Sequence, residues 1–396
     1  MVTGQVNAWQ STPAACRGDG AGPAWRQAIT KHAGEDRTMS DQPKLYIAGI
    51  GMITPVGFDT ASTAAAVKAG VSAYHASSFF TRNTRQPITM AQVPTEIFTE
   101  LEFEIDEGSH YGRQSDRIIK MAILAIREAV SNVRFTGPVP LILALPEELP
   151  DTTYIDTNLF ITNLLNQKEL PLKSGQIHLL KNGRAAGLQG IDQARQYLFE
   201  HDAEFVLLGG SDSYAVNPRV GALDRAGRVL APEIFDGFAP GEGAGFLLLT
   251  RHSEYAMNKN GWSVIVGTPG LSQEIGHLFS DKPYTGDGLD RALKISLEAL
   301  SGEKIRAVYS SLNGEHFWAK EYGVAYLRNK QYFHEEVKLE HPMDCFGDLG
   351  SATGPVLLGL AAEDLLSRMS LGTNLVYSSS DGPWRAAVTL SNNRIS

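Results

Sequence analysis

The sequence predicts an α/β protein in which helices cover a parallel or mixed sheet. Three observations indicate this class: the unbroken apolar run PLILAL at residues 140–145, a helix reaching to about residue 200, and a second apolar run at residues 204–208. Unbroken apolar runs are typical of strands that are buried on both faces, and such sheets carry helices on either side. The second half of the chain repeats the order of elements without residue-level identity, so the repeat is architectural.

The first half opens with a segment unlike the rest. Residues 1–43 lack a sustained hydrophobic period and a signal-peptide pattern, so we expect a flexible or mis-called N-terminal extension. Residues 45–50 predict a buried strand, and residues 116–130 predict an amphipathic helix that Ser115 can cap. The other expected elements are a short helix at residues 61–68, loop-like and short extended pieces at 74–110, and a helix at 154–165.

The second half follows a glycine-dense stretch. Residues 236–250, DGFAPGEGAGFLLLT, predict a turn and a strand whose small residues let two backbone layers approach closely. The elements expected after it are strands at residues 264–267, 307–311, 374–377 and 386–390, and helices at residues 288–300, 318–329 and 356–368. We therefore divide the chain into halves at residues 44–250 and 251–396.

Composition narrows the classes of function. The 396 residues carry a net charge of −9, which makes nucleic acid or an anionic membrane surface an unlikely main partner. The two cysteines form no metal-binding pattern and no disulfide framework, which fits a reducing cytoplasm. The sequence has no apolar run of about eighteen residues, so we expect no transmembrane helix. We also expect neither a cofactor nor a metal.

A sharp bend at residues 179–194, LLKNGRAAGLQGIDQA, is the most informative stretch. Leu179 and Leu180 close a strand, Asn182 and Gly183 are turn formers that tolerate positive φ, and apolar residues then recur at helical spacing. In enzymes such a strand-to-helix turn holds a nucleophile at a helix N-terminus. This chain has Arg184 there.

These segments together resemble the thiolase superfamily and, within it, the β-ketoacyl synthases. The resemblance spans residues 44–390 and is carried by YIAGIGMITPVG, the bend with its helix, GGSDS, DGFAPGEGAGFLLL and GDLGSATGP. It implies a thiolase fold: two pseudo-twofold-related α/β halves in a five-layer αβαβα arrangement, paired into dimers through sheet edges.

The family's chemistry, which the resemblance implies, uses one cysteine and two histidines. The cysteine attacks an acyl thioester, and the histidines support decarboxylation. By motif, the cysteine position falls on Arg184, the first histidine on Asn313 in SLNGEHF, and the second on Gly347 in CFGDLGSATG. A slip of one residue would bring Phe346 or Asp348 to the last position, and neither is a histidine. The resemblance therefore predicts a degenerate triad and no catalytic residues.

Each residue of the remaining pocket has two interpretations. Arg184 either binds an anionic ligand or forms an ion pair, for which Asp348 is a plausible partner because the family brings these two loops together. Asn313 and Glu315 either contact a ligand or satisfy a turn. His316 is either a displaced base or a packing residue, and Cys345 is either a relocated nucleophile or a small buried hydrophobe.

Three functions follow from the resemblance. The first is a non-catalytic scaffold or adaptor in a bacterial gene cluster, such as one that loads effectors for type VI secretion, with a self-dimer, chaperone or effector as partner. The second is a chain-length-factor-like partner of an active ketosynthase in fatty acid, polyketide or aryl-polyene synthesis, where an acyl carrier protein is a further possible partner. The third is an acyltransferase with a rebuilt site. The segment ALPEELP, which replaces a glycine-rich turn, suggests a pocket that is remodelled or filled.

Overall fold

A computed structural model describes residues 43–99, 112–148, 155–298, 300, 302–367 and 372–395. The expected N-terminal extension lies outside these residues apart from its last position. The strands are β1 (Leu45–Ile53), β2 (His75–Phe80), β3 (Pro87–Met90), β4 (Leu141–Ala144), β5 (Ile177–Leu180), β6 (Phe205–Ser213), β7 (Glu242–Thr250), β8 (Trp262–Val266), β9 (Gly270–Gln273), β10 (Ile305–Ser310), β11 (Phe333–Glu340), β12 (Thr373–Ser379) and β13 (Trp384–Arg394). The helices are α2 (Thr60–Lys68), α3 (Gly112–Val130), α4 (Thr157–Asn166), α5 (Ala186–Phe199), α6 (Asn217–Arg225), α7 (Asp287–Leu297), α8 (His316–Arg328), α9 (Met343–Phe346) and α10 (Thr353–Ser367).

The strands form one large mixed sheet in the order β11-β10-β12-β13-β8-β1-β7-β6-β4-β5, with β9 added beside β13. Strands β1, β7, β6, β4 and β5 form one wing of this sheet, and β8 to β13 form the other. The wings are joined where Leu45 and Tyr46 of β1 pair with Val266 and Ile265 of β8. In the first wing β4 runs parallel to both β5 and β6, as the unbroken apolar runs predict. The thiolase-like α/β fold is confirmed, and its two sheets are continuous here because β1 bridges them.

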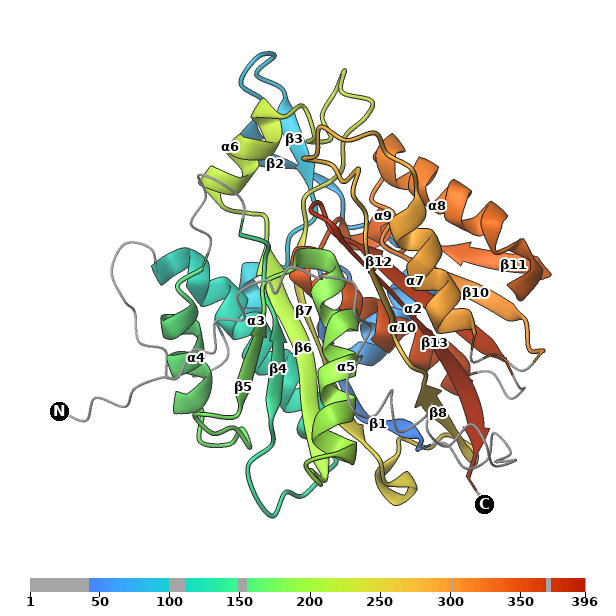
Figure 1. Cartoon of the computed structure of the whole chain (residues 1–396). Helices are drawn as coiled ribbons and strands as arrows, with labels where there is room; N and C mark the ends of the chain where they lie inside the picture. The colour runs from blue at the N-terminus through green and yellow to red at the C-terminus, as the bar shows by residue number, and fades with distance from the viewer. Residues whose placement is uncertain are drawn as a thin grey trace.

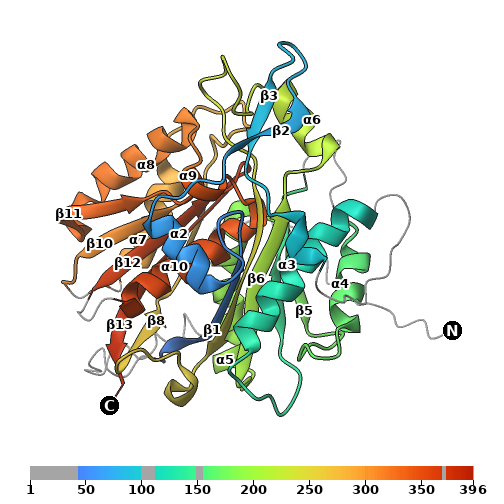
Figure 2. The same ribbon diagram turned by 180° about the vertical axis from the view of Figure 1, so that it is seen from behind.

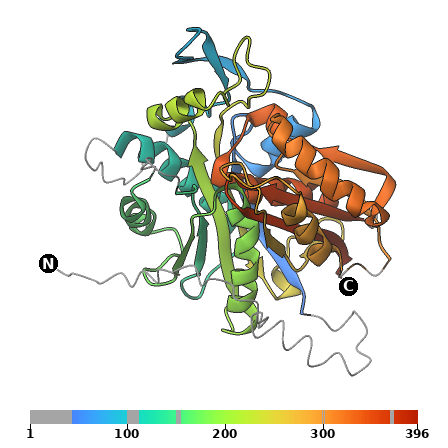
Figure 3. The ribbon, with the colours of Figure 1, turned by 45° about the horizontal axis from the view of Figure 1, so that its top comes forward.

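Helices cover the two wings on both faces (Figures 1 and 2). Helix α3 packs against β1, β7 and β6, whereas α5 packs on β6 and β4. Helix α10 contacts β7 of the first wing and β12 of the second, so that α5 and α10 lie between the wings. Helix α7 covers β13 and β9 and also contacts α8. Figure 3 shows the same arrangement with the top of the molecule turned toward the viewer.

Two glycines set the distance between β1 and α3. A Cβ added at Gly49 would lie 1.9 Å from the carbonyl oxygen of Ala129, and one at Gly51 would lie 1.8 Å from that of Ala125. The strand therefore packs its backbone directly on the helix backbone. Glu128 of the same helix accepts hydrogen bonds from the backbone N–H groups of Met52 and Thr60, which fixes the chain where β1 ends and α2 begins.

The structure corrects several expected elements. Helix α3 begins at Gly112, so Ser115 lies inside its first turn and is not the N-cap. The short strands β2 and β3, which pair as a hairpin, agree with the short extended pieces expected at residues 74–110. Strand β11 escaped prediction because its sequence, FHEEVKLE, is charged, as suits a strand at the sheet edge that is paired on one side only. Among the described residues, no helix is long and apolar enough to cross a membrane.

Candidate functional site

The bend predicted at residues 179–194 is present and directs one side chain into the interior. After β5 the chain turns through Gly183, whose φ of +61° belongs to the left-handed region that glycine adopts without strain. Asn182 has a φ of −118°, so only one of the two turn formers uses positive φ. A 3₁₀ turn at Gly183–Ala185 leads into α5. Its central residue, Arg184, has only 3% of its surface exposed.

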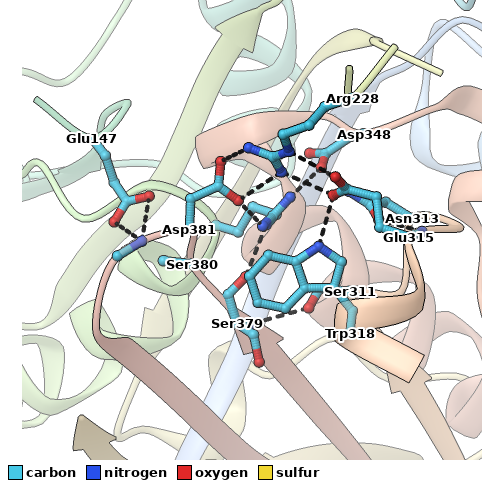
Figure 4. A network of polar contacts seen from close by, with 12 residues as sticks. Glu147, Arg228, Ser311, Asn313, Glu315, Trp318, Asp348, Ser379, Ser380 and Asp381 are labelled. Atoms are coloured by element: carbon cyan, nitrogen blue, oxygen red, sulfur yellow. Dashed lines mark hydrogen bonds and ion pairs between the residues drawn. The ribbon is translucent and has the colours of Figure 1, made fainter. Parts of the chain in front are cut away.

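All three nitrogens of the Arg184 guanidinium have a partner (Figure 4). Nε donates to the carbonyl oxygen of Ser379 at 2.8 Å, Nη1 donates to Asp348 and Nη2 donates to Asp381. The guanidinium also lies over the ring of Trp318, 4.6 Å from its centroid. The predicted ion pair with Asp348 is therefore confirmed, and Asp381 is a second partner.

Arg228 extends this cluster. Its Nε and Nη2 donate to Glu315 at 2.6 and 2.8 Å, and its Nη1 donates to Asp381 at 2.7 Å. Glu315 also accepts from the indole N–H of Trp318 at 2.9 Å. We call Arg184, Arg228, Asn313, Glu315, Trp318, Asp348 and Asp381 the elbow network. Its members come from both wings of the sheet, so the network ties the wings together.

The charges of the elbow network stabilise one another. Burial disfavours the charged form of Arg184, but the carboxylates of Asp348 and Asp381 outweigh it and raise the pKa of the guanidinium. Burial alone would raise the pKa of Asp381, yet Arg184 and Arg228 hold that pKa well below its usual range. Both groups therefore stay ionised at neutral pH. A guanidinium held in this way cannot act as a nucleophile or a base.

The structure brings together some of the predicted pocket residues. Asn313 donates to Asp348 at 3.0 Å and to Glu315 at 3.1 Å, and its Oδ1 accepts from the backbone of Glu315 at 3.2 Å. The side chain of Asn313 thus satisfies its turn and joins the elbow network. Gly347 stands beside Asp348 with a φ of +73°, and a Cβ there would lie 2.6 Å from the carbonyl oxygen of Ala239.

Three other predicted residues lie outside the elbow network. The side chain of His316 is 79% exposed and pairs with Asp236 at 2.9 Å, because α8 begins at this residue and turns it outward. Cys345 and Phe346 belong to the hydrophobic core. Burial, followed by the nearby charge of Asp344, raises the pKa of the Cys345 thiol, which disfavours the reactive thiolate.

A cavity of about 580 Å³ opens beside Arg184. Its walls include Pro146, Glu147 and Glu148 after β4, Lys181 to Arg184 after β5, and Asp212 and Tyr214 at the end of β6. The cavity therefore lies at the carboxyl ends of parallel strands, where open α/β sheets bind their ligands. Pro146, Glu147 and Glu148 of the segment ALPEELP thus line an open cavity.

Sequence reasoning missed three residues of this region. Arg228 and Asp381 stand in loops, and neither belongs to a motif whose spacing links it to Arg184, which is 44 and 197 positions away, respectively. Glu147 stands within ALPEELP, where no spacing links it to Arg184. The one available signal was the acidic turn SDG at residues 380–382, which follows a predicted strand and lies at its carboxyl end.

Comparison with known proteins agrees with this architecture. Residues 174–255 match the β-ketoacyl synthase N-terminal domain family. Over 317 residues the chain is 23% identical to 3-oxoacyl-[acyl-carrier-protein] synthase 2 of Staphylococcus aureus, covering 70% of this chain and 74% of that protein.

Solved structures share the fold at lower identity. One is a type II polyketide synthase acyl-carrier protein in complex with its ketosynthase, matched with a TM-score of 0.68 at 15% identity over 90% of this chain and 100% of the other. Another is a ketosynthase in complex with its chain length factor from Xenorhabdus doucetiae, with a TM-score of 0.63 at 13% identity over 91% of this chain and 100% of the other.

The fold and the bend with its helix thus define a ketosynthase-like protein. The matched segment makes residues 174–255 similar to the β-ketoacyl synthase N-terminal domain, and the shared fold is that of the ketosynthase structures.

Proposed function

We propose that this chain is a non-catalytic, ketosynthase-fold subunit that binds a ligand or a protein partner and forms no acyl-enzyme. The observation that carries this proposal is the state of Arg184. It stands at the bend where the family resemblance expects a nucleophilic cysteine, and each guanidinium nitrogen donates to an oxygen of the protein. A side chain so placed blocks the position and supplies no electron pair.

The other two family positions support the same proposal. Asn313 and Gly347 stand where the resemblance expects histidines, and neither can exchange a proton near neutral pH. The structure gives neither Cys345 nor His316 the surroundings of a replacement nucleophile or base. Cys345 is packed in the core with a raised pKa, and His316 points to Asp236 at the surface.

Acylation by a thioester tests the proposal. We expect the intact mass of the protein to remain unchanged after incubation with octanoyl-coenzyme A at pH 7.5, because no described thiol or hydroxyl is activated in the elbow network. An active ketosynthase treated in parallel serves as the positive control and should gain one octanoyl group. A covalent octanoyl adduct on any residue of this chain would overturn the proposal.

A second candidate is a partner subunit of an active ketosynthase. Two observations favour it over the type VI adaptor, which rests on the resemblance alone. The solved structures with this fold include a ketosynthase with its chain length factor and one with its acyl-carrier protein. In addition, β5 lies at one edge of the sheet, where it pairs with β4 alone among the described strands. A free edge of this kind can extend the sheet into a second subunit.

Co-expression distinguishes a mixed pair from a self-dimer. If the chain is such a partner, native mass spectrometry after co-expression with a ketosynthase from the same genome should show a 1:1 complex. That complex should persist in the presence of an excess of this chain alone. Detection of self-dimers only, with the ketosynthase pairing solely with itself, would contradict this second candidate.

A further inference from the structure

We infer that the cavity beside Arg184 binds a small organic ligand with a protonated amine on an apolar body, and that Glu147 is the counter-ion of the amine. This inference goes beyond the proposed function, which concerns the chemistry that the site lacks. It rests on three features of the cavity: the balance of its charges, the fixed position of one carboxylate, and the apolar nature of its walls.

One carboxylate of the cavity has no lysine or arginine bound to it among the described residues. The four lysine and arginine side chains that line the cavity are each bound to acidic residues: Lys181 to Glu148, Arg219 to Asp212, Arg184 to Asp348 and Asp381, and Arg228 to Glu315 and Asp381. Glu147 also lines the cavity, but among the described residues its carboxylate oxygens accept only from the backbone N–H of Gly382, at 3.1 and 3.3 Å. An additional cation is therefore favoured, and an additional anion is disfavoured.

Two glycines leave room for the Glu147 side chain and lie close against it. A Cβ at Gly183 would lie 2.8 Å from Cγ of Glu147, and a Cβ at Gly382 would lie 2.7 Å from its Oε1. Glu147 thus fits between the bend of the first wing and the β12–β13 turn of the second, as its contact with Gly382 shows. A carboxylate whose position is fixed before binding loses little conformational freedom when a ligand arrives.

The groups around Glu147 leave its negative charge incompletely balanced. Burial and the neighbouring Asp381 raise the pKa of Glu147 from 4.5 to about 7, against the opposing effects of Arg184, the Gly382 N–H and Arg385. On the same wall, burial and the charge of Arg385 lower the pKa of His277, so this imidazole is neutral at pH 7 and does not repel an ammonium group. A bound ammonium would supply the missing positive charge and displace the proton from Glu147.

The rest of the wall suits an apolar body. Leu223, Pro146, Phe279 and Trp384 line the cavity, and the two aromatic rings add faces that attract cations. The volume of about 580 Å³ lies within the range of sites that enclose small ligands. The ligand we infer is thus amphipathic, with its amine at Glu147 and its apolar part against these residues.

Three probes of equal chain length test the inference: octylamine, octanol and octanoate, titrated calorimetrically at pH 7 into the full chain. We expect octylamine to bind most tightly. Glu147→Gln should weaken its binding at least about tenfold, as expected for the loss of a charged partner. Glu335→Gln is the matched control, because it removes the same charge from an exposed residue of β11 that does not line the cavity, and it should change octylamine binding less than about twofold.

Proton release provides a readout that needs no variant. Titrations in buffers of different ionisation enthalpy should show that octylamine binding expels part of a proton at pH 7. The inference is overturned if none of the probes binds, if octanol or octanoate binds as tightly as octylamine, or if no proton is released. It is also overturned if a folded Glu147→Gln protein binds octylamine like the wild type. None of these outcomes affects the acylation test with octanoyl-coenzyme A, so the proposed absence of an acyl-enzyme is tested separately.

Discussion

Replacing Arg184 by methionine should lower the free energy of unfolding by about 3–5 kcal/mol. The substitution keeps much of the apolar length of the side chain but leaves Asp348 and Asp381 buried without their shared cation. Removing one partner of a buried ion pair costs far more than the pair contributes, because the remaining charge stays desolvated. Urea denaturation at pH 7 measures the change.

A surface pair is the control for this prediction. Arg251 binds Asp202, whose side chain is 84% exposed, and Arg251→Met should cost less than about 1 kcal/mol. Adding Asp348→Asn to the Arg184→Met protein should recover part of the loss, because it removes the buried charge that has lost its cation, whereas Asp381 keeps its ion pair with Arg228. If Arg184→Met were no more destabilising than Arg251→Met, the elbow network would not be the electrostatic unit described above.

Glu147 should make the protein less stable as the pH rises from about 4.5 to above 7. Its pKa is raised from 4.5 to about 7 in the folded state, so folding takes up a proton within this window. The contribution is fully present below the unfolded pKa and is lost as the pH passes the folded one, a change of about 2–3 kcal/mol. Thermal unfolding of the wild type and Glu147→Gln across pH 4.5–8 measures it.

The Glu147→Gln protein should not show this loss of stability with rising pH, because it lacks the titrating carboxyl group. Relative to Glu147→Gln, the wild type should lose stability steadily across the window, whereas Glu148→Gln should follow the wild type. Asp381 acts in the opposite direction and at lower pH, because its lowered pKa makes stability fall only as the pH drops below its usual value of 3.8. Parallel curves for the wild type and Glu147→Gln would show that folding does not change the pKa of Glu147.

The sequence predicted the fold well because its signals are local. Unbroken apolar runs identified β4 and β6, and helical spacing identified α3 and α5, to within a few residues at each end. The main omission is β11 at the sheet edge, where burial is one-sided. Such strands lack the apolar pattern from which they could be recognised.

The candidate site could be predicted only in part. The turn at Gly183 and the pairing of Arg184 with Asp348 followed from a local pattern and from a family resemblance. The roles of Arg228, Asp381 and Glu147 depend on contacts between loops that are far apart in the sequence. A charged loop residue has the same appearance in a sequence whether it is solvated or buried. His316 is the opposite case. It is close to Asn313 and Glu315 in the sequence, but its side chain lies at the surface and not in the elbow network.

The position of β1 has a consequence for how the protein folds during synthesis. This strand lies in the middle of the sheet, yet its partners are β7 and β8, about 200 residues further along the chain. During translation β1 is synthesised long before β7 and β8. It therefore has no strand partner while most of the protein is being made. Closure over such a sequence separation is slow, and the exposed strand is open to wrong associations in the meantime. We therefore expect nascent chains of this protein to depend on chaperones until β8 has emerged.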